Sequence, residues 1–386
     1  MHKFIPYGTQ DIGKEEIDEV ISVLKSDFLS TGPKIKEFEN KFANYVGSKY
    51  AVAVSSGTAA LHCACLAAGI KEGDEVITTP FTFVATSNSI LYRGASPVFV
   101  DINKDTFNIN ESNIEEKITS RTKAIIPVHF AGQPCEMDKI KEIANKYNLI
   151  IIEDAAHALG AEYKNRKIGT IGDMTTFSFH PVKHITTGEG GMITTDNEEL
   201  YKKLLIYRNH GITRDESEFV NNKDGNWYYE QIELGYNYRL TDFQSALGIV
   251  QLDKMQSSLN RRNEIVEMYE KELNEIEELK LPKVSNEIKS SWHLYIIRVT
   301  DKSINRKEVF DKLREKNIGV NVHYIPVYWN PYYEKLGYKK GLCPNVEEIY
   351  KQIITLPLHP KMTNEDVEYI IKSLKDIIRE LKENGK

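Results

Sequence analysis

The sequence has few cysteines, no cluster of basic residues and no long apolar run, and each absence narrows what the protein can be. The spacings of its four cysteines fit neither a zinc site nor a disulfide framework, so we expect no metal and a reducing compartment. With a formal net charge of −6 and dispersed Lys and Arg, the chain lacks the basic surface of general nucleic-acid binders. The N-terminus MHKFIPYGTQ has no apolar signal region, and no stretch is long enough to cross a bilayer. We therefore expect a cytoplasmic protein with neither a nucleic-acid nor a membrane partner.

The first two-thirds of the chain alternate between short β-branched runs and helical patterns. Helices are expected at 58–68 and 137–147, and an earlier one is indicated by apolar residues at helical spacing, namely Ile17, Val20, Ile21 and Leu24. Strands are expected at 51–54, 75–79, 97–101, 124–128, 149–152, 174–179 and 191–195. This alternation predicts an α/β fold in which a mostly parallel seven-stranded sheet lies between helices. Ligands of such sheets bind beyond the carboxyl ends of the strands.

Beyond about residue 250 the pattern changes to charge-rich helical segments, with strand candidates at 293–299 and 319–323. Thr363 followed by Asp366 resembles a capping box at the start of a final amphipathic helix. We interpret residues 1–255 as a large α/β domain, whose N-terminal segment contributes to the active-site cleft, and residues 256–386 as a small α+β domain. The apolar stripe of the final helix consists of Val367, Ile370, Ile371, Leu374, Ile378 and Leu381.

The first motif with chemical meaning is Ser55-Ser56-Gly57-Thr58, which follows a strand and opens a helix. The first N–H groups of a helix have no intrahelical partner and lie at the positive end of its dipole, so they suit a phosphate. Gly57 permits close backbone approach, and Thr58 adds a hydroxyl donor. Serine and threonine are just as common here as simple helix caps, so this motif alone leaves both interpretations open.

A second motif places Asp154 just past a very apolar strand, at the ligand-binding edge of the expected sheet. A carboxylate in such a place needs a cationic partner, and a protonated pyridine nitrogen would serve. The alternative is a helix N-cap, and the motif by itself does not decide between the two.

The decisive motif is SFHPVKHITTGEGG, residues 178–191, in which Lys183 follows the end of a strand in a loop rich in Thr and Gly. Pro181 stops the strand from continuing. A lysine held near a phosphate site and a carboxylate can form a Schiff base with an aldehyde cofactor, because desolvation and neighbouring charge lower its pKa and free its amine. This context argues against an ordinary solvated lysine.

Together the three motifs resemble the DegT-type nucleotide-sugar aminotransferases, a family of fold type I enzymes that use pyridoxal 5′-phosphate (PLP). The resemblance extends along nearly the whole chain and includes residues 29–33, 80–86, 127–129 and 235–242. It implies that Lys183 carries PLP covalently and that Asp154 pairs with the pyridinium nitrogen, which keeps the ring an electron acceptor.

The resemblance also implies the remaining cofactor contacts. Phe83 would lie over the cofactor face and His157 near its phenolic oxygen. Asn237 would reach the phosphate from the neighbouring subunit, which implies a homodimer with shared active sites. From the residues alone, Phe83 is only a core aromatic and Asn237 only a turn residue. The phosphate contacts within the subunit would be Gly57, Thr58 and Ser178.

The same family implies a transamination in two halves. L-glutamate would give its amino group to the cofactor, leaving pyridoxamine 5′-phosphate (PMP), which would then aminate a keto sugar while Lys183 moves the proton. The loop HPVKHITTGEGG resembles members that act at C4, and residues 226–231, 322–327 and 331–338 resemble aminotransferases of the pseudaminic-acid pathway. The implied acceptor is a UDP-linked 4-keto-6-deoxy-N-acetylhexosamine of L-altro type. Bacillosamine-type, 4-amino-arabinose-type and dTDP-linked substrates stay open as alternatives.

Contacts to the substrates are the least determined part of the resemblance. A diphosphate or a donor carboxylate calls for charge-assisted donors, which makes Arg239 and His323 candidates. Arg239 could equally form a structural ion pair, and His323 could equally be a satisfied core histidine. The candidate substrate contacts are Thr31, His184, Arg239, His323 and Tyr324.

Two other functions compete with sugar amination. Family members that dehydrate the sugar at C3 carry His at the position of Lys183, which argues against that reaction here. A non-catalytic regulatory protein on the same fold would be expected to have lost Asp154, Lys183 or the phosphate residues, and the sequence retains all of them.

Overall fold

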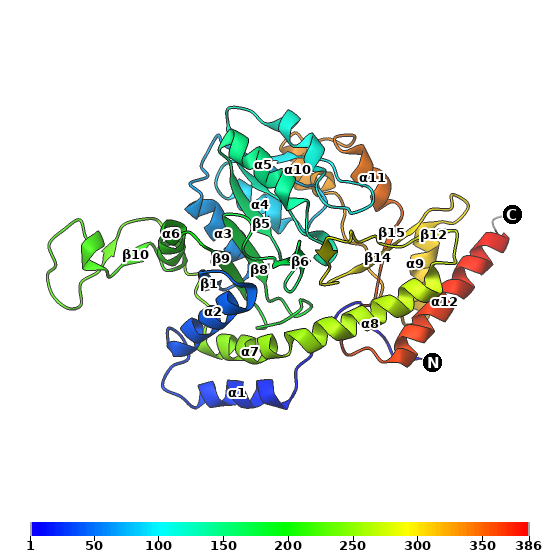
Figure 1. The fold of residues 1–386 in the computed structure, drawn as a ribbon, viewed down its shortest axis with the longest axis horizontal. Helices are drawn as coiled ribbons and strands as arrows, with labels where there is room; N and C mark the ends of the chain where they lie inside the picture. Colours follow the sequence, from blue (N-terminus) through cyan, green and yellow to red (C-terminus); the bar gives the residue numbers. More distant parts are fainter. Residues whose placement is uncertain (1, 385–386) are drawn as a thin grey trace.

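A computed structural model describes residues 2–384, and its largest feature is a seven-stranded sheet (Figure 1). The strands lie in the order β1-β9-β8-β5-β4-β2-β3. Neighbours from β8 to β3 run parallel, whereas β9 is antiparallel to both β1 and β8. The mostly parallel sheet expected from the sequence is therefore confirmed. Its strands are β1 (Tyr50–Val54), β2 (Glu75–Thr78), β3 (Ser96–Phe99), β4 (Thr122–Ile126), β5 (Ile150–Asp154), β8 (Met174–Ser178) and β9 (Gly191–Thr195).

Helices cover both faces of this sheet because successive strand residues point to opposite sides. On β5, Ile151 joins the hydrophobic cluster that contains Phe38 and Phe42, whereas Ile152 joins the cluster around α3. The helices of this part are α1 (Lys14–Leu24), α2 (Pro33–Val46), α3 (Gly57–Ala67), α4 (Ala85–Leu91), α5 (Met137–Tyr147), α6 (Glu198–Arg208) and α7 (Asp242–Asp253), with 3-10 turns at η1 (Glu111–Asn113), η2 (Glu115–Lys117) and η3 (Phe130–Gly132). Both clusters are apolar, so each side of the sheet has its own core.

The C-terminal part is built on a three-stranded antiparallel sheet, which shares one hydrophobic cluster with α8, α9 and α12 (Figure 1). The apolar stripe expected for the last helix is buried there, and Thr363 and Asp366 each accept the other's backbone N–H, as a capping box requires. Both expectations are confirmed, while the domain boundary near residue 255 stays a prediction. The elements are α8 (Met255–Leu273), β12 (Leu279–Lys280), β14 (Tyr295–Val299), α9 (Arg306–Glu315), η5 (Val327–Trp329), α10 (Pro331–Lys335), α11 (Pro344–Tyr350), β15 (Ile353–Leu356) and α12 (Asn364–Asn384).

The segment 319–323 does not form the strand expected for it. Asn321 makes a single backbone bridge to Thr355, while its side chain bonds the His323 ring and that ring bonds the Thr355 hydroxyl. Side-chain hydrogen bonds thus replace a regular ladder, and the segment turns towards the cavity described below. A smaller sheet elsewhere joins β6 (Glu162–Tyr163), β7 (Arg166–Lys167) and β13 (Ile288–Lys289).

Helix α1 forms where its spacing predicts, but its apolar stripe faces outwards. Ile17 is 52% exposed and Leu24 is 55% exposed. The residues of α1 that are buried are Glu16 and Val23, and the Glu16 carboxylate accepts hydrogen bonds from Gln251 and Lys254 at the end of α7. Helical periodicity predicts the element, but it does not tell which face the rest of the chain covers.

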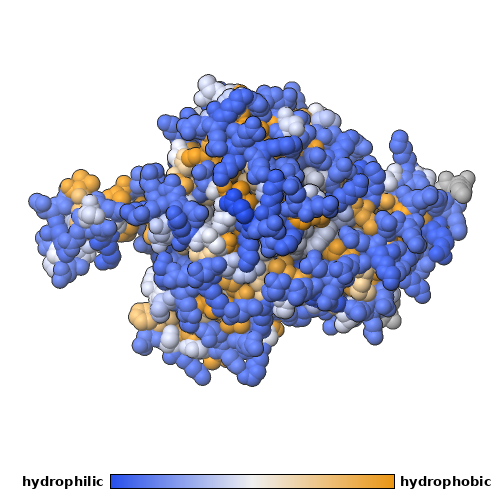
Figure 2. Space-filling view, viewed as in Figure 1, coloured by the Kyte–Doolittle hydropathy of each residue, from blue (hydrophilic) through white to orange (hydrophobic). Residues whose placement is uncertain are grey.

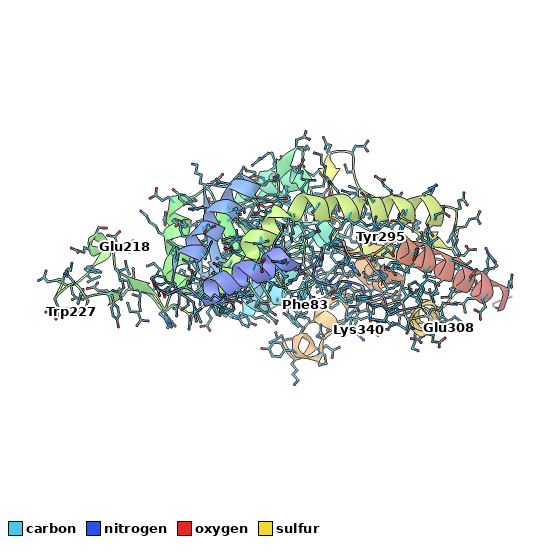
Figure 3. All side chains as sticks on the ribbon, turned by 90° about the horizontal axis from the view of Figure 1, so that it is seen from below. Phe83, Glu218, Trp227, Tyr295, Glu308 and Lys340 are labelled. Carbon is cyan, nitrogen blue, oxygen red and sulfur yellow. The ribbon has the colours of Figure 1, made fainter. Side chains whose placement is uncertain are left out.

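An arm made of β10 (Ile212–Thr213), η4 (Glu216–Glu218) and β11 (Glu230–Gln231) projects from the body (Figures 1 and 3). Apolar side chains are exposed on it, including Val220 at 84% and Trp227 at 70% (Figure 2). Within residues 2–384, no helix combines the length and apolarity needed to cross a membrane. The same residues contain no group of three or more His, Cys, Asp or Glu side chains arranged to hold a metal ion.

Candidate active site

A cavity of about 560 Å³ lies at the carboxyl edge of the large sheet, and all three sequence motifs line it. Asp154 is the last residue of β5 and Ser178 the last of β8, while α3 begins at Gly57 soon after β1 ends. Lys183 enters from the loop that follows β8. The topology therefore brings an amine, a carboxylate and a helix N-terminus around one space, as the sequence hypothesis required.

The N-terminus of α3 forms one end of this cavity. Ser56 caps the helix by accepting the N–H of Ala59 at 3.0 Å, so the N–H groups of Gly57 and Thr58 are the first-turn donors without an intrahelical partner. A Cβ on Gly57 would lie 2.8 Å from Cβ of Ser178. The serine hydroxyl thus lies against the helix start, and together these groups form a cradle of backbone and hydroxyl donors suited to a phosphate.

Asp154 is only 5% exposed and its carboxylate is held at both oxygens. Thr86 donates its hydroxyl to Oδ2 at 2.7 Å, and the N–H of Ala156 donates to Oδ1 at 3.1 Å. No helix begins after β5, because the chain continues as turns, so the N-cap alternative is wrong. The carboxylate is instead oriented at the cavity wall.

Lys183 is partly buried in a tight turn, where its N–H donates to the carbonyl of His180 at 2.9 Å. Its Nζ lies 3.5 Å from Nε2 of His293. Burial lowers the pKa of the Lys183 amine to about 8, although the Asp154 carboxylate opposes this shift. A neutral amine is therefore accessible near physiological pH, as Schiff-base chemistry requires.

An aromatic ring and a neutral imidazole complete the wall. Phe83 is 58% exposed, and its ring centroid lies 6.2 Å from that of Tyr324. His157 is buried, and its Nε2 lies 3.2 Å from the Tyr324 hydroxyl, while its Nδ1 has no hydrogen-bond partner among residues 2–384. Burial lowers the pKa of His157 well below its usual value, so the ring is neutral. Its unsatisfied nitrogen leaves a polar position for a ligand.

This donor set fits PLP. The α3 N-terminus and Ser178 suit the phosphate, Asp154 suits the protonated ring nitrogen, and Lys183 suits the aldehyde carbon. The neutral His157 offers its unpaired nitrogen to a polar ring substituent. When bound, PLP supplies an electron sink for a carbanion. These residues would hold the cofactor and complement its charges.

The sequence comparison agrees with this chemistry. Residues 10–375 match the DegT/DnrJ/EryC1/StrS aminotransferase family. The chain belongs to this family. It is accordingly a PLP-dependent sugar aminotransferase, and the PLP and PMP expectations drawn from the sequence are confirmed.

Relatives of this aminotransferase span its whole length. An uncharacterised protein of Methanocaldococcus jannaschii is 52% identical over 98% of both chains. The spore coat polysaccharide biosynthesis protein SpsC of Bacillus subtilis is 46% identical over 97% of both. A UDP-4-amino-4,6-dideoxy-N-acetyl-beta-L-altrosamine transaminase of Campylobacter jejuni is 41% identical over 98% of both.

Solved structures of the family confirm the fold type I architecture. Spr1654 of Streptococcus pneumoniae, described provisionally as a sugar aminotransferase, was solved in its PMP form. It has a TM-score of 0.92 and 35% identity, with 98% of this chain and 100% of that chain covered. PseC of Helicobacter pylori, described as an aminotransferase involved in the biosynthesis of pseudoaminic acid, has a TM-score of 0.90 and 33% identity, with 98% and 100% covered.

Not every predicted site residue of the aminotransferase lines the cavity of its own subunit. Thr31 and Arg239 line a different cavity of about 650 Å³ beside α2 and α6, where Arg239 donates to Asn209 at 2.7 Å. Asn237 pairs with Asn209 through a backbone bridge and lies outside the lining of the cofactor cavity. His323 and Tyr324 do line the cofactor cavity, so two of the five substrate candidates are brought to it.

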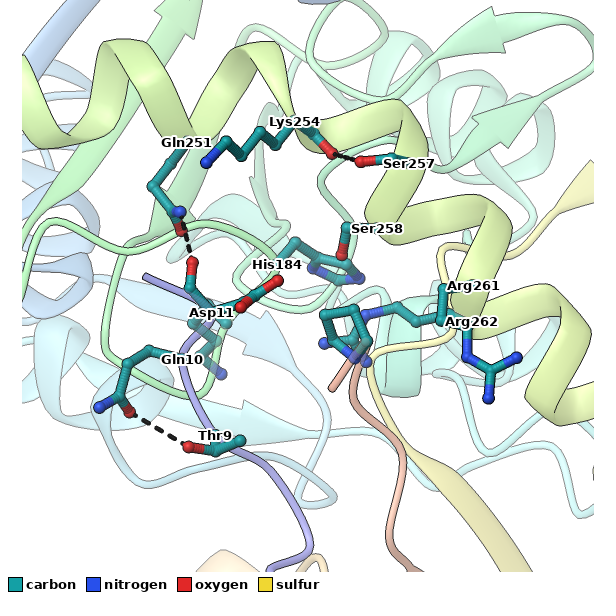
Figure 4. Close-up of a pocket in the computed structure, with 12 residues that line it drawn as sticks. Thr9, Gln10, Asp11, His184, Gln251, Lys254, Ser257, Ser258, Arg261 and Arg262 are labelled. Atoms are coloured by element: carbon teal, nitrogen blue, oxygen red, sulfur yellow. Dashed lines mark hydrogen bonds between the residues drawn. The ribbon is translucent and has the colours of Figure 1, made fainter. Parts of the chain in front are cut away.

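His184 lies on the other side of the lysine loop. Its Nε2 donates to the carbonyl of Ser291 at 2.9 Å, and it lines a separate cavity of about 240 Å³ with residues of α8 (Figure 4). His323 has partners at both ring nitrogens, Thr355 at 2.9 Å and Asn321 at 3.3 Å, as the core-histidine interpretation expected. Roles of both residues in substrate binding stay predictions.

Four residues near the cofactor site were missed by sequence reasoning. In the sequence, Thr86 is only part of a segment that resembles the family, and His293 only begins a strand candidate. Tyr7 and Asn321 line the cavity from the N-terminal segment and from the segment before Val322. The wider expectation that the N-terminal segment contributes to the active-site cleft stays a prediction. No local pattern marks Thr86 and His293, because their partners are far away in the sequence.

Proposed function

We propose that this enzyme transfers the amino group of L-glutamate to C4 of a UDP-linked 4-keto-6-deoxy-N-acetylhexosamine of L-altro type. The observation that carries this proposal is the 41% identity, over 98% of both chains, to the Campylobacter jejuni transaminase named for the UDP-linked altrosamine product. The likeness to PseC at a TM-score of 0.90 supports it. The lysine loop HPVKHITTGEGG supports amination at C4.

The 46% identity to SpsC favours a second candidate within the same chemistry. In that case the acceptor would be another UDP- or dTDP-linked 4-keto sugar, of the bacillosamine, 4-amino-arabinose or dTDP-4-amino-sugar type. The cofactor residues would do the same work in either reaction, because only the acceptor changes.

The residues of the chain have distinct tasks in this reaction. The N–H groups at the start of α3 and the Ser178 hydroxyl hold the cofactor phosphate. The Asp154 carboxylate, oriented by Thr86, stabilises a proton on the ring nitrogen. The Lys183 amine, with its pKa of about 8, takes and returns the migrating proton, which is typically worth ~10²–10⁴-fold in rate.

We also propose a homodimer in which Asn237 of one subunit completes the phosphate site of its partner. In support, Asn237 lies outside the cofactor cavity of its own subunit, although the family resemblance assigns it to the phosphate. The four cysteines are free and buried, which fits a reducing compartment, so we place the enzyme in the cytoplasm.

A panel of UDP- and dTDP-linked 4-keto sugars with L-glutamate as donor tests the acceptor. We expect the UDP-linked L-altro sugar to give the highest kcat/KM and a product aminated at C4. A preference for a dTDP-linked sugar would favour the second candidate, and amination at C3 would contradict both. Replacing L-glutamate by other amino acids in the same assay tests the donor.

Mixing two inactive variants tests the shared active site. Lys183→Ala and Asn237→Ala subunits are combined after dissociation and reassociation. If Asn237 serves the partner, a mixed dimer has one site with both residues intact, and activity returns. If each subunit uses its own Asn237, both sites stay defective and the mixture remains as inactive as its components.

A further inference from the structure

We propose that His293 is a positioning residue for Lys183, whose amine donates an N–H to Nε2 of His293 and is thereby aimed at the cofactor cavity. The two nitrogens are 3.5 Å apart, at the long end of hydrogen-bond distances, and His293 is 5% exposed. Within residues 2–384, Nδ1 of this ring has no partner, so Lys183 is the one side-chain hydrogen-bond partner of the imidazole. This proposal does not depend on which sugar is the acceptor.

His293 reaches the lysine from the C-terminal part of the chain. It precedes β14, whereas Lys183 follows β8, and 110 positions separate the two residues. Its ring centroid lies 4.4 Å from that of His157 and 5.4 Å from that of His184. Two other imidazole rings thus pack against that of His293, so it cannot change its rotamer without displacing them.

The backbone around His293 is held in an unusual conformation. Trp292 has φ +48° and Ala131 has φ +57°, and both values lie in the left-handed region that residues other than glycine rarely adopt. The N–H of His293 donates to the Ala131 carbonyl at 2.9 Å. A Cβ on Gly132 would lie 2.8 Å from the Trp292 nitrogen, so this close approach requires glycine. Strain of this kind persists where surrounding contacts over-determine the geometry.

A buried guanidinium fixes the same turn from the other side. Arg262 of α8 is 2% exposed, and its Nη1 donates to the carbonyls of Trp292 at 3.0 Å and Leu358 at 2.9 Å. Within the described residues it has no acidic partner, so its hydrogen bonds go to backbone oxygens of this turn and of the segment after β15. Figure 4 shows its side chain beside His184. Arg262 therefore ties the His293 turn to α8.

The imidazole is uncharged in this environment. Burial lowers the pKa of His293 well below its usual value, and the nearby Lys183 charge lowers it further. A neutral ring can accept an N–H from the amine, whereas an imidazolium would repel it. The other titratable groups that face Lys183 or His293 are Asp154, His157, His184, His323 and Arg262.

A purely structural role for His293 predicts a different outcome on substitution. If the ring only fills space between the two parts of the chain, an apolar side chain of similar size should serve. If it accepts from Lys183, a side chain with an acceptor at the place of Nε2 should serve, and an apolar one should not. Glutamine provides such an acceptor, leucine does not, and asparagine is polar but too short.

The test measures the Lys183 amine directly in the enzyme freed of cofactor. Trace acetylation at a series of pH values, with mass spectrometry of the peptide that contains Lys183, gives the pKa of its amine. An acceptor favours the ammonium form, because charge-assisted hydrogen bonds are the stronger ones. We expect His293→Leu to lower that pKa by roughly one unit, and His293→Gln to restore it. In the loaded enzyme, kcat should fall in the leucine variant while KM for the sugar stays the same.

His359→Leu is the matched control, since His359 is also buried and, within the described residues, makes no hydrogen bond with Lys183. It should leave the pKa of the Lys183 amine as in the parent. If His293→Leu does not fold, His293→Asn takes its place in the comparison with glutamine. Equal pKa values in the parent and in the leucine or asparagine variant would overturn the proposal, and so would a glutamine variant that behaves like leucine.

Discussion

The hydroxyl of Thr86 donates to Oδ2 of Asp154 across 2.7 Å, in the wall of the cofactor cavity. Thr86 lies on α4 and Asp154 ends β5, so two separate βα units fix one carboxylate. A second hydroxyl, that of Thr82, lies 2.8 Å from the Thr86 oxygen. The carboxylate that must stabilise the ring nitrogen is therefore oriented by the protein itself before the cofactor binds.

Thr86→Val should weaken the binding of PLP while leaving the fold intact. The change keeps the side-chain shape but removes the hydroxyl that donates to Asp154. Because a hydrogen bond to a charged group contributes substantial free energy, we expect its loss to reduce the affinity for PLP roughly tenfold. Titration of the cofactor-free enzyme with PLP, followed by absorbance, measures this. Thr78→Val is the control, because Thr78 is equally buried and its hydroxyl bonds the Ile126 carbonyl away from the site. Equal affinities in the two variants would contradict the role given to Thr86.

Gly57→Ala should also reduce affinity for PLP, through the phosphate cradle. The new Cβ would lie 2.8 Å from Cβ of Ser178, so the helix start and the serine must move apart. The free-energy cost of this overpacking should reduce the affinity for PLP on the order of tenfold. Gly13→Ala, whose Cβ would be no closer than 3.4 Å to any atom, serves as the control. If the cradle is the cause, inorganic phosphate should compete with PLP less well in the alanine variant than in the parent.

The rate at which the cofactor-free enzyme takes up PLP covalently should rise with pH. Only the neutral form of the Lys183 amine reacts, and its pKa of about 8 lies below the usual value. The neutral fraction therefore grows by about tenfold between pH 7 and pH 9 and changes little above that. Stopped-flow absorbance measures the rate. A rate that keeps rising up to pH 10.5 would show an unperturbed lysine and contradict the effect of burial.

Much of this fold and site follows from local sequence. The seven strands of the large sheet and the capping box at Thr363 are marked by periodicity and by short-range hydrogen-bonding patterns. Asp154 ends a strand, and Gly57 and Lys183 follow the ends of two others, at the edge of the sheet where this topology places ligands. These residues could be predicted because their positions in the site depend on the strand or helix next to them in the sequence.

What the sequence could not supply is pairing between distant segments. His293 contacts Lys183 only because Arg262 and the left-handed Trp292 hold its turn in place. For α1, periodicity does not reveal that Glu16 faces the body while the apolar stripe faces outwards. These outcomes depend on tertiary packing, which overrides local preference.

Lys183→Ala should give a folded protein that binds PLP without a covalent bond and does not turn over. The alanine removes both the group that forms the Schiff base and the proton carrier, so kcat should fall by at least ~10³-fold. Thermal melting should show that the fold survives, since the deleted amine is partly buried and has no ion-pair partner among the residues that the structure describes. Residual turnover near the parent level would assign proton transfer to another group.

The attachment site of the cofactor is the most direct measure of the whole account. The PLP-loaded enzyme is reduced with borohydride, digested and mapped by mass spectrometry. The pyridoxyl group should be found on the peptide that contains Lys183, and it should be absent when the enzyme is first converted to the PMP form with L-glutamate. A label on another lysine, or none on any, would contradict it.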